Sequence, residues 1–179
     1  MPESPEPGAM TRDELYQFLM GSVRFAAVSS LRKDGSPVVV PLGFWYDRTY
    51  VYLTIAPARG GVYRLRRDPR VSISVFNDQF PVRYVTFQGV AEEIPDPGYE
   101  ISLRIHRRYP KEHAVDSAAY ERAWLSTGKV VFRIRLDRYR SLDLTNIGDL
   151  VEDGAMEASE KRRLRAAATE AAQGGSSEP

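Results

Sequence analysis

The sequence predicts a mainly β protein in which short antiparallel strands close into a barrel, with helices packed outside it. About six stretches rich in β-branched and aromatic residues are bounded by turn residues, as strands usually are. Few helical segments lie between them, which favours antiparallel pairing of successive strands over parallel crossovers. The 179 residues, 42% of them hydrophobic, suffice for one domain with a substantial core.

Capping and turn residues set the boundaries of the predicted elements. Thr11 and Glu14 form a capping-box pattern, which begins a helix over 11–20. The dipeptide Asp34-Gly35 readily takes positive φ and predicts a hairpin turn between the first two strands. The predicted strands cover residues 25–31, 37–45, 50–55, 71–75, 83–92 and 130–136. The second strand is nearly all apolar, so we expect both of its faces to be covered.

Two helical segments and two polar tails complete the chain. A short basic helix is expected at 60–67, and residues 97–126 are helical with an interruption at Pro110. Residues 1–10 are acidic and proline-rich, and we expect them to be disordered. After residue 151 no aromatic, Ile or Val occurs, so 145–179 is expected to be a polar extension, partly helical or disordered. The folded domain is therefore 11–144.

Composition excludes several classes of function. The chain has no cysteine, which rules out disulfide scaffolds, thiolate metal sites and a cysteine nucleophile. A net charge of +1 argues against binding to nucleic acid or to an acidic membrane surface. No apolar run reaches the ~20 residues that a membrane span needs, and the acidic N-terminus is unlike a signal peptide. We therefore expect a cytoplasmic protein.

The junction between the third strand and the short basic helix is the main candidate for chemistry. The strand ends just before Arg59, and Gly60 and Gly61 open the helix. Paired glycines let a ligand approach the backbone, and a helix N-terminus beside a guanidinium favours a phosphate. Arg59 and Arg64 are the predicted phosphate ligands. The alternative is that these arginines simply form the solvated face of a helix.

Other catalytic and metal-binding patterns are absent from the sequence. His106 and His113 are seven residues apart with no evident third ligand, so we expect no metal site. The chain has no nucleophile elbow, P-loop or dinucleotide fingerprint. No catalytic residue can be named from the sequence.

These features together resemble the flavin and deazaflavin oxidoreductases of the split β-barrel fold, relatives of pyridoxamine 5′-phosphate oxidase. The segments that carry the resemblance are Ala27-Val28, Asp34-Gly35-Ser36-Pro37, Val40-Pro41-Leu42, Arg59 through Arg70, Gln88-Gly89-Val90-Ala91 and the last strand as far as Ser141. The resemblance spans about residues 11–144. A further segment, Tyr109, Glu112-His113 and Tyr120, looks like the branch that uses the deazaflavin coenzyme F420.

The resemblance implies a homodimer of FMN-binding-type split barrels, with two cofactor sites in grooves at the subunit interface. The cofactor ring would lie against Val40, Pro41 and Leu42, with backbone contacts from Thr54, Ile55 and Ala56. Arg59 would reach the phosphate. The family often has a lysine two residues after this arginine, whereas this chain has Gly61. A missing cation would weaken phosphate binding by about 1–3 kcal/mol unless Arg64 compensates.

The function that follows is an oxidoreductase that uses F420 to transfer a hydride to a small unsaturated or quinone-like substrate. The basic stretch 104–108 is a candidate site for the anionic tail of F420. Tyr120, His113 or bulk water would supply the proton. One alternative is the same fold with FMN as its cofactor. Another is a non-catalytic protein that holds a cofactor, haem or a lipid-like ligand.

Overall fold

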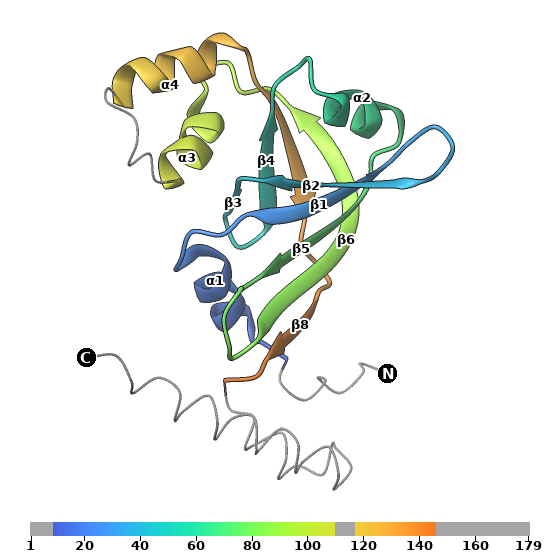
Figure 1. Cartoon of the computed structure of the whole chain (residues 1–179), viewed down its shortest axis with the longest axis vertical. Coiled ribbons are helices and arrows are strands. Elements are labelled where there is room, and N and C mark those ends of the chain that lie inside the picture. Colours follow the sequence, from blue (N-terminus) through green and yellow to red (C-terminus); the bar gives the residue numbers. More distant parts are fainter. Residues whose placement is uncertain (1–8, 110–116, 146–179) are drawn as a thin grey trace, which may run out of the picture.

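The computed structural model describes residues 9–109 and 117–145 of the chain. Most of the two predicted tails, as well as Pro110 and His113, lie outside the described residues. The described elements are α1 (Arg12–Met20), β1 (Ala26–Leu31), β2 (Pro37–Leu42), β3 (Phe44–Tyr46), β4 (Tyr50–Ile55), α2 (Gly60–Arg67), β5 (Arg70–Phe76), β6 (Arg83–Ile94), α3 (Glu100–Arg108), α4 (Ser117–Ser126), β7 (Val130–Arg135) and β8 (Arg140–Asp143). Figure 1 shows their arrangement.

The strands form one antiparallel sheet that curls into a partly closed barrel. Its strand order is β2-β1-β5-β6-β7-β4-β3, and β8 pairs with β6. The two ends of this order are β2 and β3, which are consecutive in the chain and are joined at Gly43. The chain therefore links the two edges of the sheet (Figure 1). This arrangement confirms the predicted split-barrel fold.

The capping residues at the start of the fold behave as predicted. The Thr11 side chain accepts a hydrogen bond from the Glu14 backbone, and the Glu14 side chain accepts one from the Thr11 backbone at 2.7 Å. In the β1–β2 turn, Gly35 has a φ of +82°, which glycine tolerates without strain. None of the helices in the described part of the chain is long and apolar enough to cross a membrane.

The described residues contain eight strands rather than about six, for two reasons. The predicted strand 37–45 is broken at Gly43 into β2 and β3. A Cβ at Gly43 would lie 2.8 Å from Cε2 of Tyr109, so the absence of a side chain lets the tyrosine ring pack against this bend. The second reason is β8, a short strand with little apolar character that the sequence pattern did not single out.

Within one copy of the chain, only one face of the second strand is packed, whereas the sequence led us to expect both faces to be covered. Along β2, exposed and half-buried residues alternate, and Val39 is 61% exposed. The strand lies at an edge of the sheet, where an apolar sequence does not by itself bring a covering layer. Pro37, Val39 and Pro41 make the exposed face of β2 apolar.

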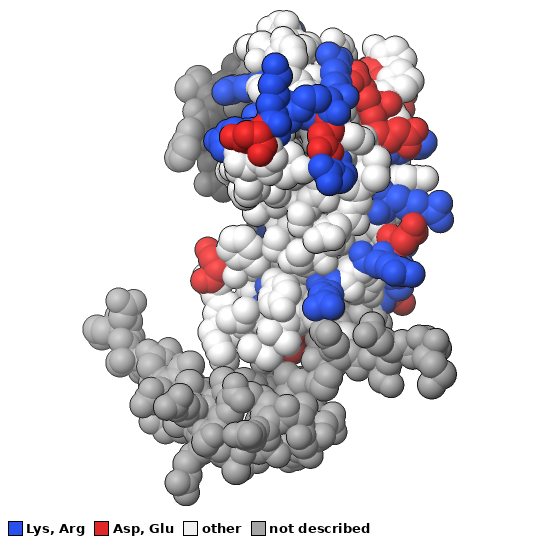
Figure 2. Space-filling model, turned by 90° about the vertical axis from the view of Figure 1, so that its right-hand side faces the viewer, with Lys and Arg blue, Asp and Glu red and all other residues white. Residues whose placement is uncertain are grey.

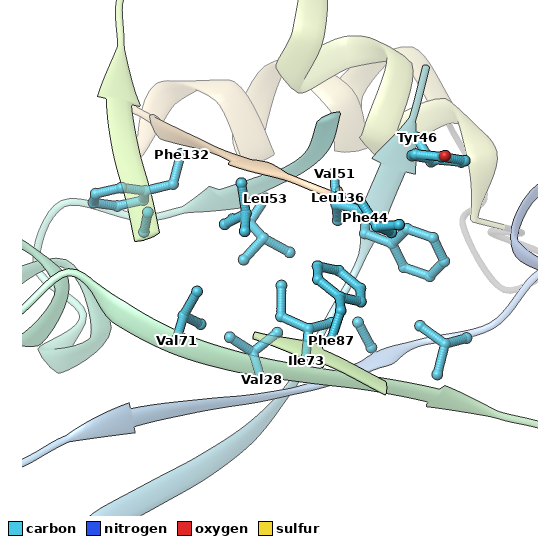
Figure 3. Close-up of a cluster of buried hydrophobic side chains, with 14 of the residues drawn as sticks. Val28, Phe44, Tyr46, Val51, Leu53, Val71, Ile73, Phe87, Phe132 and Leu136 are labelled. Carbon is cyan, nitrogen blue, oxygen red and sulfur yellow. The ribbon is translucent and has the colours of Figure 1, made fainter. Parts of the chain in front are cut away.

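The core fills the inside of the barrel. Figure 3 shows Val28, Val71, Ile73 and Phe87 on one side facing side chains of β3, β4 and β7 on the other. Helix α1 adds Leu15, Phe18 and Leu19, which are at most 1% exposed. β6 passes close to β7 at Gly89, where a Cβ would lie 2.6 Å from Cγ2 of Ile134.

Tyr109, which follows α3, ties the helical end of the molecule to the bend of the barrel. Its hydroxyl accepts a hydrogen bond from the Phe44 backbone nitrogen at 2.8 Å and donates one to the Arg24 carbonyl at 2.9 Å. Its ring stacks on Phe25 with centroids 4.8 Å apart. Burial raises the pKa of Tyr109, so the phenol stays protonated and keeps both bonds. These contacts give Tyr109 a structural role.

Candidate cofactor-binding groove

A groove of about 740 Å³ opens at the end of the barrel where β4 meets α2. It is lined by Val40, Pro41, Leu42, Thr54, Ile55, Ala56, Ala58, Arg59, Gly60, Gly61, Arg64, Trp124, Thr127 and Lys129. All ten residues that the sequence analysis assigned to cofactor binding are in this set. The structure thus brings together two strand ends, a helix N-terminus and the turn between α4 and β7.

A tight turn delivers Arg59 to the groove. The Arg59 backbone nitrogen donates to the Ala56 carbonyl at 2.9 Å, which closes the turn directly after β4. Arg59 is the N-cap of α2, with an extended backbone and no hydrogen bond from its side chain to the helix end. Its exposed side chain is therefore not used in capping, and the first-turn amides of α2 receive no side-chain cap.

Arg64 folds back over the first turn of its own helix. Its Nε donates to the hydroxyl of Ser30, a buried residue, at 2.8 Å, which fixes the guanidinium. A Cβ at Gly60 would lie only 3.0 Å from Nη1 of Arg64, whereas one at Gly61 would lie 3.8 Å from Nη2. The guanidinium therefore occupies space left by Gly60. The guanidinium and the N-terminal end of α2 are both positive and repel each other. A bound anion would relieve this repulsion.

The opposite wall of the groove comes from the far end of the chain. Ile55 pairs with Val130 in the β4–β7 ladder, so Lys129 comes next to the end of β4. A Cβ at Gly128 would lie 3.4 Å from Cγ of Pro57, which brings the two turns into contact. Trp124, Thr127 and Lys129 were missed by the sequence analysis because they reach the groove through this pairing.

The Lys129 ammonium is held at the end of α4. Its Nζ donates to the Trp124 carbonyl, to the Thr127 hydroxyl and, at 3.0 Å, to the Gly128 carbonyl. It also lies 4.2 Å from the centroid of the Trp124 ring, a cation–π contact. Burial lowers the pKa of Lys129, since desolvation disfavours its charged form.

The electrostatics of the groove differ from those of the neighbouring surface. Its described lining has three cations, Arg59, Arg64 and Lys129, and no carboxylate. Elsewhere basic and acidic side chains are interleaved, as the upper part of Figure 2 shows. Ion pairs close to α2 and the C-terminal end of β6 include Arg66–Glu93, Arg70–Asp68 and Arg133–Glu92. The groove cations have no such partner among the described residues.

The arginines of 104–108, proposed above as a tail site, do not line the groove. Arg107 pairs with Glu121 at 2.9 Å, and Arg104 lies over the Trp45 ring. Arg108 donates to the carbonyls of Leu19, Met20 and Ser22 and so holds the end of α1. Arg107 and Arg108 link α3 to other helices and Arg104 packs on β3, and the expectation that they provide a tail site is not supported by their positions.

The candidate proton donors lie away from the groove or outside the described residues. Tyr120 is 50% exposed and stacks on His106 with centroids 5.7 Å apart. It does not line the groove. His106 also stacks on Trp124 at 4.3 Å, so the histidine supports the wall that carries Lys129. No cluster of three potential metal ligands occurs within 9–109 and 117–145.

The fold and the groove define a class of protein: a split β-barrel with a cationic groove suited to a phosphate-bearing ligand. Comparison with known families agrees with the fold. The sequence pattern of the pyridoxamine 5′-phosphate oxidase family matches residues 12–143, and the chain belongs to this family.

Solved structures show the same fold. A conserved hypothetical protein from Mycobacterium tuberculosis is 24% identical with a TM-score of 0.66, and the match covers 81% of this chain and 92% of that one. For an F420 reductase the values are 23% identity, a TM-score of 0.55, and coverage of 69% and 94%. A FAD-binding protein from Mesorhizobium loti is 25% identical, with a TM-score of 0.53 and coverage of 74% and 93%. A search of curated protein sequences gives no significant match.

Proposed function

We propose that this protein is an oxidoreductase that binds coenzyme F420 in the groove and transfers a hydride to a small unsaturated or quinone-like substrate. The observation that carries the proposal is the gathering of three cations, with no carboxylate in the described lining, beside a helix N-terminus that no side chain caps. Such a site is stabilised by an anion, and a phosphate fits its charge. The bound deazaflavin would supply the hydride.

The residues of the groove have distinct tasks in this proposal. Val40, Pro41 and Leu42 give an apolar surface for one face of a flat ring, which excludes water from it. The end of β4, at Thr54–Ala56, offers backbone groups to the polar edge of the ring. Arg59 and Arg64 bind the phosphate, and Ser30 keeps Arg64 in position. Holding the ring fixed provides the orientation that hydride transfer requires.

FMN is the alternative cofactor, because both molecules share a tricyclic ring and a ribityl phosphate. The Tyr109 and Tyr120 segment and the F420 reductase among the structural neighbours favour the deazaflavin. The FAD-binding neighbour favours a flavin instead. Absorption of the bound cofactor distinguishes them, near ~420 nm for F420 and near ~450 nm for FMN.

A non-catalytic haem-binding role has less support from the groove. The described lining contains no His, Cys, Met or Tyr, the side chains that usually bind haem iron. A haem titration that gives no Soret shift, alongside a flavin titration that saturates, is the expected result.

We also propose that the protein is a homodimer in which a second copy covers the exposed face of β2. This face carries Pro37, Val39 and Pro41, and Pro41 also lines the groove. If a second copy covered this face, both faces of β2 would be packed, as is typical of a strand that is nearly all apolar. We expect the molar mass in solution, measured by light scattering, to be that of two chains. In Val39→Lys it should fall to the mass of one chain.

The central experiment is a titration of the apo protein with F420 and with FMN, with Arg59→Ala as the variant. Arg66→Ala is the matched control, because Arg66 belongs to the same helix but pairs with Glu93 outside the groove. We expect binding that is weakened in Arg59→Ala and unchanged in Arg66→Ala. If neither cofactor binds more tightly than ~100 µM, about −5.5 kcal/mol, the proposal is wrong.

A further inference from the structure

We propose that Lys129 supplies the cation that position 61 lacks, so that the phosphate is bound from both walls of the groove. This inference rests on the proposed function and adds a phosphate-binding residue from outside the strand–turn–helix segment. Gly61 leaves α2 with only Arg59 and Arg64 at the groove. Lys129 lines the same groove from the α4–β7 turn.

The barrel pairing fixes where this charge lies. Val130 is opposite Ile55 in the β4–β7 ladder, and Lys129 directly precedes Val130. The backbone of Lys129 therefore lies beside the end of β4. Arg59 follows Ile55, the last residue of β4, by four residues. The contact between the turns at Gly128 and Pro57 keeps the two walls together. A charge that is absent at position 61 can thus be provided from a position 68 residues further along the chain.

The present contacts of Lys129 also suit a structural role, as a cap for the C-terminal end of α4. Its Nζ donates to the Trp124 and Gly128 carbonyls, where a cation is favoured by the helix dipole. Capping alone does not account for the cluster of like charges, since no carboxylate in the described lining balances Lys129, Arg59 and Arg64. A phosphate oxygen would balance them.

An ammonium group has three donors, and all three have partners in the structure. We infer that the phosphate replaces the Thr127 hydroxyl, the partner that is itself exposed and lines the groove. The two carbonyl contacts stay in place and aim the third donor at the ligand. The Thr127 hydroxyl then loses only the bond it accepts and keeps its own donation to the Trp124 carbonyl, at 3.0 Å.

The test measures how much the phosphate contributes to binding. For each variant, Kd is measured by fluorescence titration for FMN and riboflavin, and for F420 and its phosphate-free deazaflavin core. The ratio Kd(riboflavin)/Kd(FMN) isolates the phosphate, whereas the corresponding ratio of the core to F420 also includes the anionic tail that F420 carries beyond its phosphate. Lys129→Gln keeps a donor for the α4 carbonyls and removes the charge. Lys33→Met is the matched control, because this exposed lysine in the β1–β2 turn does not line the groove.

We expect Lys129→Gln to reduce this ratio about tenfold or more, the loss of one charged hydrogen bond. Lys129→Arg should retain most of it, Lys33→Met should leave it unchanged, and adding Gly61→Lys to Lys129→Gln should restore it. Melting of each apo variant is recorded as well. A Lys129→Gln protein that melts earlier but keeps the full ratio would show that the lysine only caps α4, which overturns the inference.

The failure of this inference is distinguishable from failure of the proposed function. If the wild-type protein binds none of the four ligands, the proposed function itself is wrong. If it prefers the phosphate-bearing ligands and Lys129→Gln prefers them equally, only the role of Lys129 is refuted. If Lys129→Gln weakens both members of a pair by the same factor, the lysine acts on the ring rather than on the phosphate, and the inference is again overturned.

Discussion

Placing a lysine at position 61 should tighten phosphate binding, because it adds a cation to the wall that carries Arg59 and Arg64. The site has room for it: a Cβ at Gly61 would lie 3.5 Å from Cδ1 of Ile55 and 3.8 Å from Nη2 of Arg64, both ordinary contacts. A charged hydrogen bond contributes about 1.5–3 kcal/mol, or roughly 10- to 150-fold in Kd. Because the groove is open to solvent, we expect Gly61→Lys to tighten FMN binding by about tenfold.

The same substitution has two opposing effects on the apo protein. Replacing glycine in a helix gains roughly 0.5–1 kcal/mol, while a cation in the first turn of α2 costs about 0.3–1 kcal/mol. The melting temperature of the apo protein should therefore change little, and that of Gly61→Ala, which has the helix gain alone, should rise. Titrations with FMN and riboflavin, repeated at high salt, measure the effect. Equal tightening of both ligands by Gly61→Lys would refute the placement of the phosphate.

Three further predictions test other parts of the structure. Gly60→Ala should weaken phosphate-dependent binding several-fold in the same titration, because its Cβ would displace the Arg64 guanidinium, 3.0 Å away. Tyr109→Phe leaves two main-chain groups unpaired, so thermal melting should show a loss of about 1–3 kcal/mol, while Tyr63→Phe at an exposed site should show none. Burial and a hydrogen bond to a carboxylate raise the pKa of Tyr52 from 10.0 to about 12. The folded state then holds a proton that the unfolded chain releases, so the unfolding free energy should fall as pH rises through this window, and Tyr52→Phe should show a smaller fall in urea titrations.

Local sequence signals were sufficient to predict one wall of the groove. The strand that ends before Arg59, the glycine pair and the basic helix lie within a short stretch, and their geometry depends on a single turn. Capping and turn residues are similarly local, which explains why α1 and the turn between β1 and β2 lie where the pattern indicates. Positions 40–42 were placed by family resemblance rather than by any local rule.

The other wall could not be predicted in this way, because it depends on pairing between distant strands. Nothing in the residues around Lys129 indicates that Val130 will lie opposite Ile55. The exposed face of β2 was missed for a related reason, since an apolar run does not say whether a strand lies in the middle or at the edge of a sheet. The arginines of 104–108 show the reverse case, where a charge cluster serves helix packing through Arg107 and Arg108.

The two walls of the groove differ in what holds them. Arg59 and Arg64 belong to one turn and one helix, and Ser30 of β1 fixes the Arg64 guanidinium. Lys129 depends on the β4–β7 ladder and on Trp124, which is supported by His106 of α3. A ligand that binds both walls requires the barrel to be closed, so its binding stabilises the closed barrel. The free energy of this stabilisation grows with ligand concentration as RT ln(1 + [L]/Kd). A ligand without the phosphate would contact the apolar floor and leave the like charges of both walls unbalanced.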